Sequence, residues 1–158
     1  MTIYFYSTRG EYGCFSNFSR HGFELDGLYW YTSEHYFQAQ KFATSDRAWF
    51  DKIRTAKTPK AAATMGRSRE HPLRSDWEAV KDEIMERAVS CKFKTHAALR
   101  EILLATNDEP IVENAPGDYY WGCGKDGSGQ NKLGKILMKV REQLQPGSGY
   151  RAVLPPKL

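Results

Sequence analysis

The chain has 158 residues and a mass of 18.1 kDa, and 41% of its residues are hydrophobic and 27% charged. These values suit one globular domain with a full hydrophobic core, and they exclude a disordered tail, a collagen-like repeat and a disulfide scaffold. The formal net charge of +4 is concentrated between residues 57 and 74. This local bias suits an anionic small ligand or a nucleic acid, but it falls short of the surface of a dedicated duplex binder.

The cysteines and the termini indicate a cytoplasmic protein. Cys14, Cys91 and Cys123 are odd in number, widely spaced and without a CxxC pair, so we expect free thiols in a reducing compartment. The first residues lack a signal-peptide pattern, and no apolar run approaches the roughly 20 residues of a membrane span. The histidines form no ligand pair with the cysteines, so we expect neither a metal nor a cofactor.

Short strands are predicted in the first part of the chain. Asp26-Gly27 lies between two apolar runs and is a strong hairpin signal. Residues 13–19, rich in small and aromatic side chains, should form a loop. The strands are expected at residues 3–6, 23–25 and 28–30.

Most of the remaining chain is predicted to be helical. Each expected helix follows a residue suited to capping its N-terminus. The predicted helices lie at about 33–42, 46–55, 59–65, 76–94, 96–105 and 132–144. The expected caps of the first five are, in the same order, Thr32 or Ser33, Ser45, Thr58, Ser75 and Thr95. The sequence thus predicts an α+β fold, a helix-dominated single domain over residues 3–144 with a small antiparallel sheet, followed by a tail at 145–158. A Rossmann fold is rejected because neither βαβ alternation nor GxGxxG after a strand is present.

One helix face carries a polar stripe among aromatic residues. Glu34, Gln38 and Lys41 are spaced by four and three residues, which places them on one face of a helix. The stripe is either a solvated surface or a carboxylate and an amine directed into a pocket. In a pocket, the carboxylate can stabilise a sugar cation, and a desolvated lysine can act as a nucleophile.

A second candidate is the segment from Asp118 through three aromatic residues to Gly122. It is either buried core or an acid beside a stacking platform, in which Trp121 is the best candidate to stack on a flat base. The glycine-rich stretch from 117 to 134 ends at a helix N-terminus. It is either a phosphate cradle or a plain flexible loop.

Three arginines are further candidates for binding an anion. Arg67, with Arg69 and Arg74, can hold a phosphate through guanidinium groups. The alternative for these side chains is surface ion pairing with acids such as Asp76, Glu78 or Glu70.

Several motifs together resemble the NADAR/YbiA-like family. The resemblance extends over roughly residues 3–144. It is carried by segments 13–19, 30–42, 65–67, 73–78 and 118–134, among them Glu34-His35-Tyr36-Phe37-Gln38-Ala39-Gln40-Lys41 and Tyr120-Trp121-Gly122.

This resemblance implies an N-glycosidase that cleaves the ribose–nitrogen bond of ribosylaminopyrimidine phosphates, the early intermediates of riboflavin biosynthesis, and so removes reactive metabolites. The alternatives are a hydrolase that removes ADP-ribose from guanine in nucleic acid, and a non-catalytic module that binds ADP-ribose or a nucleotide. The expected partner is therefore a phosphorylated ribosyl-pyrimidine or an ADP-ribosyl substrate. No membrane partner is expected, and nucleic acid is a partner only if the protein removes ADP-ribose from guanine.

The expected catalytic residues are Glu34, Lys41 and Asp118. Lys41 is implied as a nucleophile, with Glu34 or Asp118 stabilising the sugar cation or activating water as the rival route. The residues expected to bind substrate are Asn17, Phe18, Gln38, Arg67, Arg74, Trp121, Gly122 and Asn131.

Overall fold

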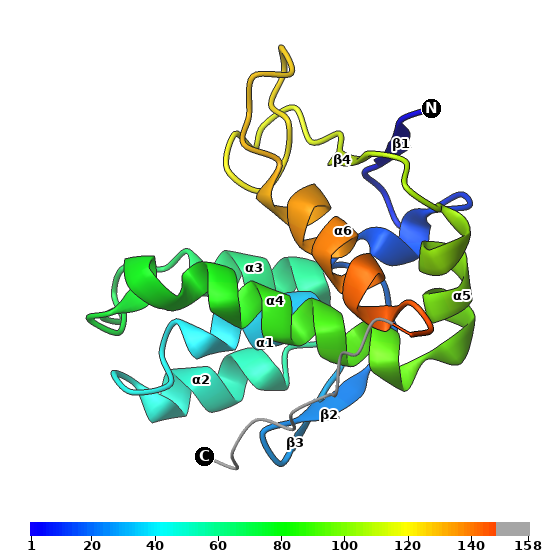
Figure 1. Ribbon diagram of the computed structural model, residues 1–158. Helices are drawn as coiled ribbons and strands as arrows, with labels where there is room; N and C mark the ends of the chain where they lie inside the picture. The colour runs from blue at the N-terminus through cyan, green and yellow to red at the C-terminus, as the bar shows by residue number, and fades with distance from the viewer. Residues whose placement is uncertain (148–158) are drawn as a thin grey trace.

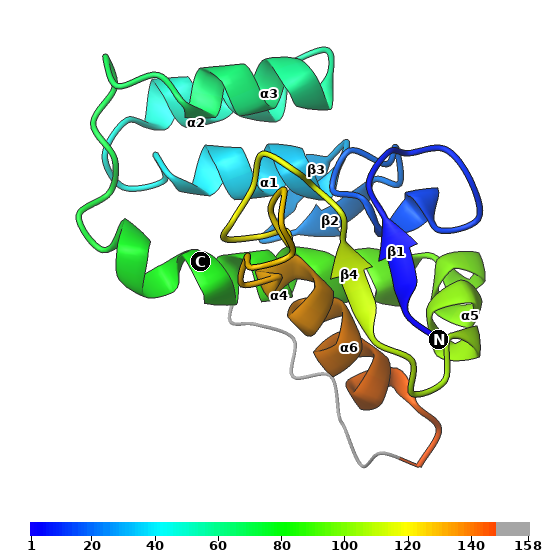
Figure 2. The ribbon, with the colours of Figure 1, turned by 90° about the horizontal axis from the view of Figure 1, so that it is seen from above.

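The computed structural model describes residues 1–147, in which helix α1 occupies the centre. Helices α2 and α3 cover one side of α1 and α4 covers the other, with α5 and α6 packed beyond α4 (Figures 1 and 2). The helices are α1 (Ser33–Gln40), α2 (Arg47–Arg54), α3 (Pro59–Gly66), α4 (Trp77–Thr95), α5 (Ala97–Ala105) and α6 (Lys132–Leu144).

The predicted hairpin is confirmed. Strands β2 (Phe23–Leu25) and β3 (Leu28–Trp30) pair antiparallel. Asp26 and Gly27 between them have φ values of 56° and 77°, and two positive φ angles fit the twist of a tight hairpin turn.

The second sheet was only half predicted. Strand β1 (Ile3–Phe5) pairs in parallel with β4 (Ile111–Glu113), with Ile3 opposite Ile111. The α+β class is confirmed, but the sheet is not solely antiparallel, and no strand was expected near residue 111. Figure 2 shows β1 and β4 side by side, with α6 next to β4.

The core is built around aromatic side chains. Trp30 is fully buried, and its ring meets Tyr36 and Phe50 edge-on at centroid distances of 5.0 and 5.6 Å. All eight residues of α1 are buried. Polar side chains on this helix therefore lie in protein rather than in water, which matters for Glu34 and Gln38.

Two of the predicted helix caps are correct. The Oγ1 atom of Thr32 accepts from the backbone N–H of His35 at 3.1 Å, and that of Thr58 accepts from Ala61 at 3.0 Å. Each bond satisfies one of the amide groups that a helix N-terminus leaves without an intrahelical partner.

Three other predicted caps are wrong by one residue. The Asp46 carboxylate accepts from the backbone N–H of Trp49 and starts α2. The expected capping box before α4 does not form, because Glu78 pairs with Lys81 on the helix surface at 2.6 Å. The caps are Asp46, Asp76 and His96 in place of Ser45, Ser75 and Thr95.

Within residues 1–147, no helix is both long enough and apolar enough to cross a membrane. Helix α6 ends at Leu144, close to the predicted end of the domain. Residues 148–158 of the expected tail lie outside the described residues.

Lys92 of α4 is a buried amine beneath the loop at 13–19. Its side chain is 1% exposed, and its Nζ donates to the carbonyl of Ser16 at 3.0 Å. Burial lowers the pKa of Lys92 to about 7. The bond anchors the residue that precedes Asn17, so it helps to fix one wall of the region described below.

The stability of the fold should therefore rise with pH. An unfolded lysine titrates near a pKa of about 10.4, so above pH 7 the unfolded state binds the extra proton. Lys92 alone should then increase the free energy of unfolding by up to about 1.4 kcal/mol per pH unit between pH 7 and pH 8, below the range in which Lys41, with a pKa of about 8, adds its own contribution. Lys92→Met should flatten this rise in urea unfolding curves, whereas Lys135→Met, on the exposed side of α6, should keep it. The same slope in wild type and Lys92→Met would contradict the assignment.

Candidate functional site

The polar stripe on α1 is buried. Glu34, Gln38 and Lys41 are 8%, 7% and 8% exposed, so the alternative of a solvated helix face is excluded. Because a buried charge is costly unless it is compensated, these side chains need partners or a chemical role.

Glu34 is held by its neighbour one turn along the helix. Gln38 Nε2 donates to Glu34 Oε1 at 2.8 Å. The pKa of Glu34 is raised above its usual value, because burial outweighs the opposing effects of the Gln38 bond and of the charges of Lys41 and Arg67. The other side of Gln38 packs on α3, since a Cβ at Gly66 would lie 1.9 Å from Gln38 Oε1.

Lys41 lies at the C-terminal end of α1 among aromatic rings. Its Nζ is 5.7 Å from the Phe37 ring centroid and 5.8 Å from the Trp77 centroid, and it donates to the carbonyl of Gly66 at 3.4 Å. Burial is the main cause that lowers the pKa of Lys41 to about 8, and the charge of Arg69 adds to it. Glu34 acts in the opposite direction, so desolvation outweighs the attraction of the carboxylate.

Arg69 and Lys41 share one acceptor. Arg69 Nη1 donates to the Gly66 carbonyl at 3.2 Å, the same oxygen that Lys41 approaches. Two cations on one carbonyl repel each other, which explains why Arg69 favours the neutral amine of Lys41.

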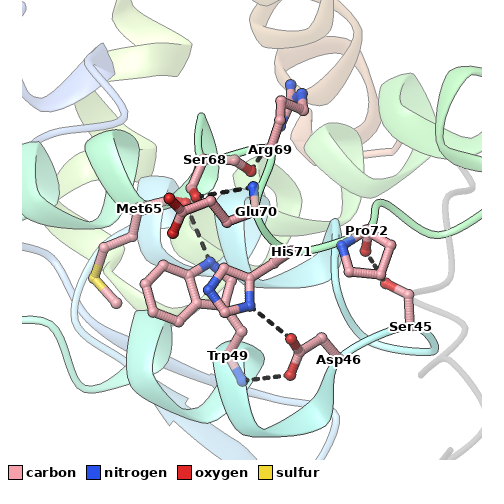
Figure 3. A network of polar contacts seen from close by, with 9 residues as sticks. All are labelled: Ser45, Asp46, Trp49, Met65, Ser68, Arg69, Glu70, His71 and Pro72. Carbon is pink, nitrogen blue, oxygen red and sulfur yellow. Dashed lines mark hydrogen bonds and ion pairs between the residues drawn. The ribbon is translucent and has the colours of Figure 1, made fainter.

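The loop that carries Arg69 is fixed to α2. The imidazole of His71 stacks on the indole of Trp49 at a centroid distance of 3.9 Å and an angle of 6° (Figure 3). Its Nδ1 lies 2.7 Å from a carboxylate oxygen of Asp46. Trp49 Nε1 also donates to the Met65 carbonyl at 3.2 Å, so α2, the end of α3 and this loop form one network.

Replacing Arg69 by glutamine should raise the pKa of Lys41. Removing the neighbouring positive charge makes the ammonium form more favourable. At pH 7 roughly a tenth of the amine is neutral with a pKa of about 8. We expect the neutral fraction, and the activity at pH 7, to fall about three- to tenfold in Arg69→Gln. Acylation of Lys41 by a small reagent across a pH series, followed by mass spectrometry, measures the pKa, and Arg9→Gln serves as the control. An unchanged midpoint would show that Arg69 does not act on Lys41.

Asp118 organises the aromatic segment that follows it. Its Oδ1 accepts from the backbone N–H groups of Tyr120 at 3.0 Å and Trp121 at 2.8 Å. The Trp121 ring then meets Phe37 of α1 edge-on at a centroid distance of 5.2 Å. The charge of Asp118 raises the pKa of Glu34. Residues about 80 positions apart in the sequence thus meet at α1.

The glycine-rich stretch is a bonded loop rather than an open phosphate cradle. The amides of Gly129, Lys132 and Leu133 donate to carbonyls of the segment 120–123 at 2.7–3.0 Å. The amides of Lys132 and Leu133 at the start of α6 are therefore already engaged, so they are not the free donors that a phosphate cradle needs. Gly122 is buried in this loop, where a Cβ would lie 2.8 Å from Ala115 Cβ.

Asn131 is engaged in structure as well. It adopts a left-handed conformation with φ of 51°. Its Oδ1 accepts from the Glu113 N–H, and its Nδ2 donates to the Ile111 carbonyl, both at 2.9 Å. Both polar atoms of the Asn131 side chain are therefore hydrogen-bonded to β4.

Asn17 lies beside α1. Its Oδ1 accepts from Ser33 Oγ at 2.8 Å, and its backbone carbonyl accepts from the Glu34 N–H at 3.2 Å. Phe18, the next residue, is 37% exposed. Asn17 thus fixes the first turn of α1.

Arg74 and Arg67 differ. Arg74 forms two hydrogen bonds to Asp76, at 2.6 and 3.2 Å, which is the ion-pairing alternative. It is also tied to the end of α1, where its backbone N–H donates to the Lys41 carbonyl at 2.8 Å. Arg67 is exposed, and its charge lowers the pKa of both Glu34 and Lys41.

Glu113, at the end of β4, was missed by the sequence analysis. Its Oε2 is buried and has no hydrogen-bond partner among residues 1–147. Burial raises the pKa of Glu113 to about 7, and the charges of Asp118 and Glu34 add to this effect. We use the name Lys41 cluster for Glu34, Gln38, Lys41, Glu113 and Asp118. In the described part of the chain, no group of three His, Cys, Asp or Glu side chains is arranged to hold a metal ion.

A separate cavity of about 380 Å³ lies near the other end of α3, between Tyr29, Tyr31 and Lys57. The ring of His35 lines it, with Nε2 donating to the Ala56 carbonyl at 2.9 Å. The cavity contains none of the predicted site residues, so it is distinct from the Lys41 cluster.

Comparison with known proteins identifies the family. Residues 4–145 match the NADAR domain, and the chain belongs to this family. It is 54% identical over 146 residues to "N-glycosidase Npun_R5314" of Nostoc punctiforme, covering 92% of this chain and 94% of that protein. It is 51% identical over 142 residues to "N-glycosidase YbiA" of Escherichia coli, covering 90% and 88%.

A solved structure and a longer relative extend this comparison. The NMR structure of the E. coli protein YbiA matches with a TM-score of 0.83 and 50% identity, over 90% of this chain and 84% of that one. The "Riboflavin biosynthesis protein PYRR, chloroplastic" of Zea mays is 41% identical over 155 residues, but those cover only 25% of its length. The fold and the family together define this chain as an enzyme of the N-glycosidase class, a hydrolase of N-glycosyl bonds.

Proposed function

We propose that this enzyme hydrolyses the ribose–nitrogen bond of ribosylaminopyrimidine phosphates, the early intermediates of riboflavin biosynthesis, and releases ribose 5-phosphate. The observation that carries the proposal is the buried amine of Lys41, whose pKa is lowered to about 8, in one cluster with the buried carboxyl group of Glu34. An amine that can act as a nucleophile and a carboxyl group in the same buried place suit the cleavage of a glycosidic bond.

The chemistry follows from the charge that develops on the sugar. Breaking the C–N bond gives C1′ the character of an oxocarbenium ion, which a nearby carboxylate stabilises. Lys41 then attacks C1′, the sugar ring opens to an imine, and water releases the sugar and regenerates the amine. In the rival route, Glu34 or Asp118 activates a water molecule that attacks C1′ directly.

The surroundings of Lys41 suit the two ends of such a substrate. Arg67 is an exposed cation whose charge reaches the cluster, so it can bind the phosphate. Trp121 is half-buried against Phe37 and offers an aromatic surface to a planar base. The riboflavin assignment is further supported by the name of the maize relative, "Riboflavin biosynthesis protein PYRR, chloroplastic".

The alternative substrate is ADP-ribosylated guanine in nucleic acid. It is favoured by the basic residues between 57 and 74. Two of them, Arg67 and Arg69, act on Lys41 through their charges. The net charge of the whole chain is only +4, which favours a small substrate.

A substrate panel tests the proposal. The purified enzyme is incubated separately with the ribosylaminopyrimidine phosphate, with DNA carrying ADP-ribosylated guanine, and with free ADP-ribose in a calorimeter. We expect ribose 5-phosphate to be released from the first. Turnover of the modified DNA alone would support the alternative, and heat of binding to ADP-ribose without any turnover would indicate a binding module.

A further inference from the structure

Glu113 is held rigidly at the edge of the Lys41 cluster. It ends β4, and the alternation of strand side chains places it on the same face as the fully buried Ile111. Its N–H donates to Asn131 Oδ1 at 2.9 Å, and its carbonyl accepts from the Cys123 N–H at 2.9 Å. The backbone is thus fixed from both sides, which a group that acts at a reacting atom requires.

The carboxyl group of Glu113 lacks the partners that its neighbours have. Its Oε2 is buried without a hydrogen-bond partner among the described residues. Glu34 accepts from Gln38 and is influenced by two cations, and Asp118 accepts from two backbone N–H groups. A buried polar atom with no partner is uncommon and requires an explanation. Gln38 Oε1 is a second such atom in the Lys41 cluster, so two groups there have unused capacity for a hydrogen bond.

The charges that act on Glu113 favour its protonated form. They come from Asp118 in the loop and from Glu34 on α1, and both are negative. Together with burial they raise the pKa of Glu113 to about 7. Among the groups that act on Glu113, none favours its anionic form, and its Oε2 has no hydrogen-bond donor among the described residues.

N-glycoside hydrolysis needs such a proton. When the C1′–N bond breaks, its electron pair goes to the nitrogen, and an amine leaves readily only if it receives a proton. In the route through the imine, Lys41 cannot supply it, because the amine must be neutral to attack C1′. Glu34 already accepts a hydrogen bond from Gln38, and Asp118 accepts two from backbone N–H groups.

We propose that Glu113 is the catalytic acid that protonates the leaving nitrogen. The carboxyl proton of Glu113 passes to nitrogen as the C1′–N bond breaks, and C1′ bonds to Lys41 or to water. Water then supplies the hydroxyl group of the released sugar, and its remaining proton restores the Glu113 carboxyl group. This role rests on the N-glycosidase activity under Proposed function, but not on which base the substrate carries.

Leaving-group dependence tests the role directly. Ribosylamine 5-phosphates of aniline and of nitroaniline differ mainly in how much the departing nitrogen needs a proton. We expect Glu113→Gln to lower kcat about 10²- to 10⁴-fold for the aniline and less than about tenfold for the nitroaniline. The fall in wild-type rate at alkaline pH, as Glu113 loses its proton, should be absent in the variant. Glu113→Asp should recover part of the rate.

Glu24→Gln, on the exposed face of β2, serves as the control. Equal losses on both leaving groups in Glu113→Gln would overturn the proposal and leave a structural role. Independently of turnover, we expect an infrared C=O band of a protonated carboxyl at pH 6 that Glu113→Gln loses and Glu34→Gln keeps, because the pKa of Glu34 is raised as well. If Glu113→Gln removes no such band from the wild-type spectrum, the proposal is also overturned. Failure of the wild type to cleave any ribosylamine, with this band present, would instead count against the proposed function.

Discussion

Sodium borohydride added during turnover should trap the sugar on Lys41. If the amine attacks C1′ and the ring opens, the imine is reduced to a stable secondary amine. Mass spectrometry of a digest should then show ribose-derived mass on the peptide that contains Lys41. Lys41→Met should abolish this adduct and lower kcat by at least about a thousandfold, as expected when a covalent nucleophile is removed.

Two controls separate chemistry from folding and from unspecific labelling. Lys60→Met, on the exposed side of α3, should keep both adduct and activity. Lys41→Arg retains a positive charge without a nucleophile and should also be inactive. No adduct in the wild type, together with appreciable turnover in Lys41→Met, would eliminate the imine and leave Glu34 and Asp118 to carry the reaction through water.

Glu34→Gln should produce the second large effect. The variant keeps an oxygen that can accept from Gln38 but loses the negative charge facing the sugar. We expect kcat to fall about 10²- to 10⁴-fold, because stabilisation of the cationic transition state is lost.

Glu34→Gln should also shift the pKa of Lys41, in the direction opposite to the shift expected for Arg69→Gln. Glu34 raises the pKa of Lys41, so its removal should move that pKa below about 8, whereas Arg69→Gln moves it above. Acylation of Lys41 across a pH series measures both shifts, with Glu24→Gln as the neutral control. A loss of less than about fivefold in kcat for Glu34→Gln would show that the charge is not needed in the reaction.

Local signals predicted those parts of the fold that depend on local contacts. The hairpin follows from Asp26-Gly27, and the start of α1 follows from Thr32, because both are set by residues within a few positions. Strand β4 was missed because three residues pair with a partner 108 positions away, and nothing near Ile111 signals that pairing.

The same distinction applies to the candidate site. The helical spacing of Glu34, Gln38 and Lys41 predicted a shared face, and the structure shows that this face is buried. Glu113 was missed because it lies on the unpredicted strand. That its carboxyl oxygen is buried without a hydrogen-bond partner, near the charge of Asp118, can be recognised only from the folded structure.

The glycine-rich loop shows why composition alone misleads about binding. Free amides at a helix N-terminus would bind phosphate, but here they donate to carbonyls of the preceding segment. Such backbone pairing within a loop has no signature in the residue types, because any residue other than proline can donate through its N–H group. The side chain of Asn131 is also engaged within the protein, because it is hydrogen-bonded to the backbone of β4.

A competition assay tests the central claim most directly. The enzyme receives the ribosylaminopyrimidine phosphate and an oligonucleotide with ADP-ribosylated guanine in one tube at equal concentration, and the release of each sugar is followed over time. The ratio of the two initial rates equals the ratio of the kcat/KM values. The account predicts that ribose 5-phosphate appears first, and that Lys41→Met releases neither sugar. Faster loss of ADP-ribose from guanine would contradict it.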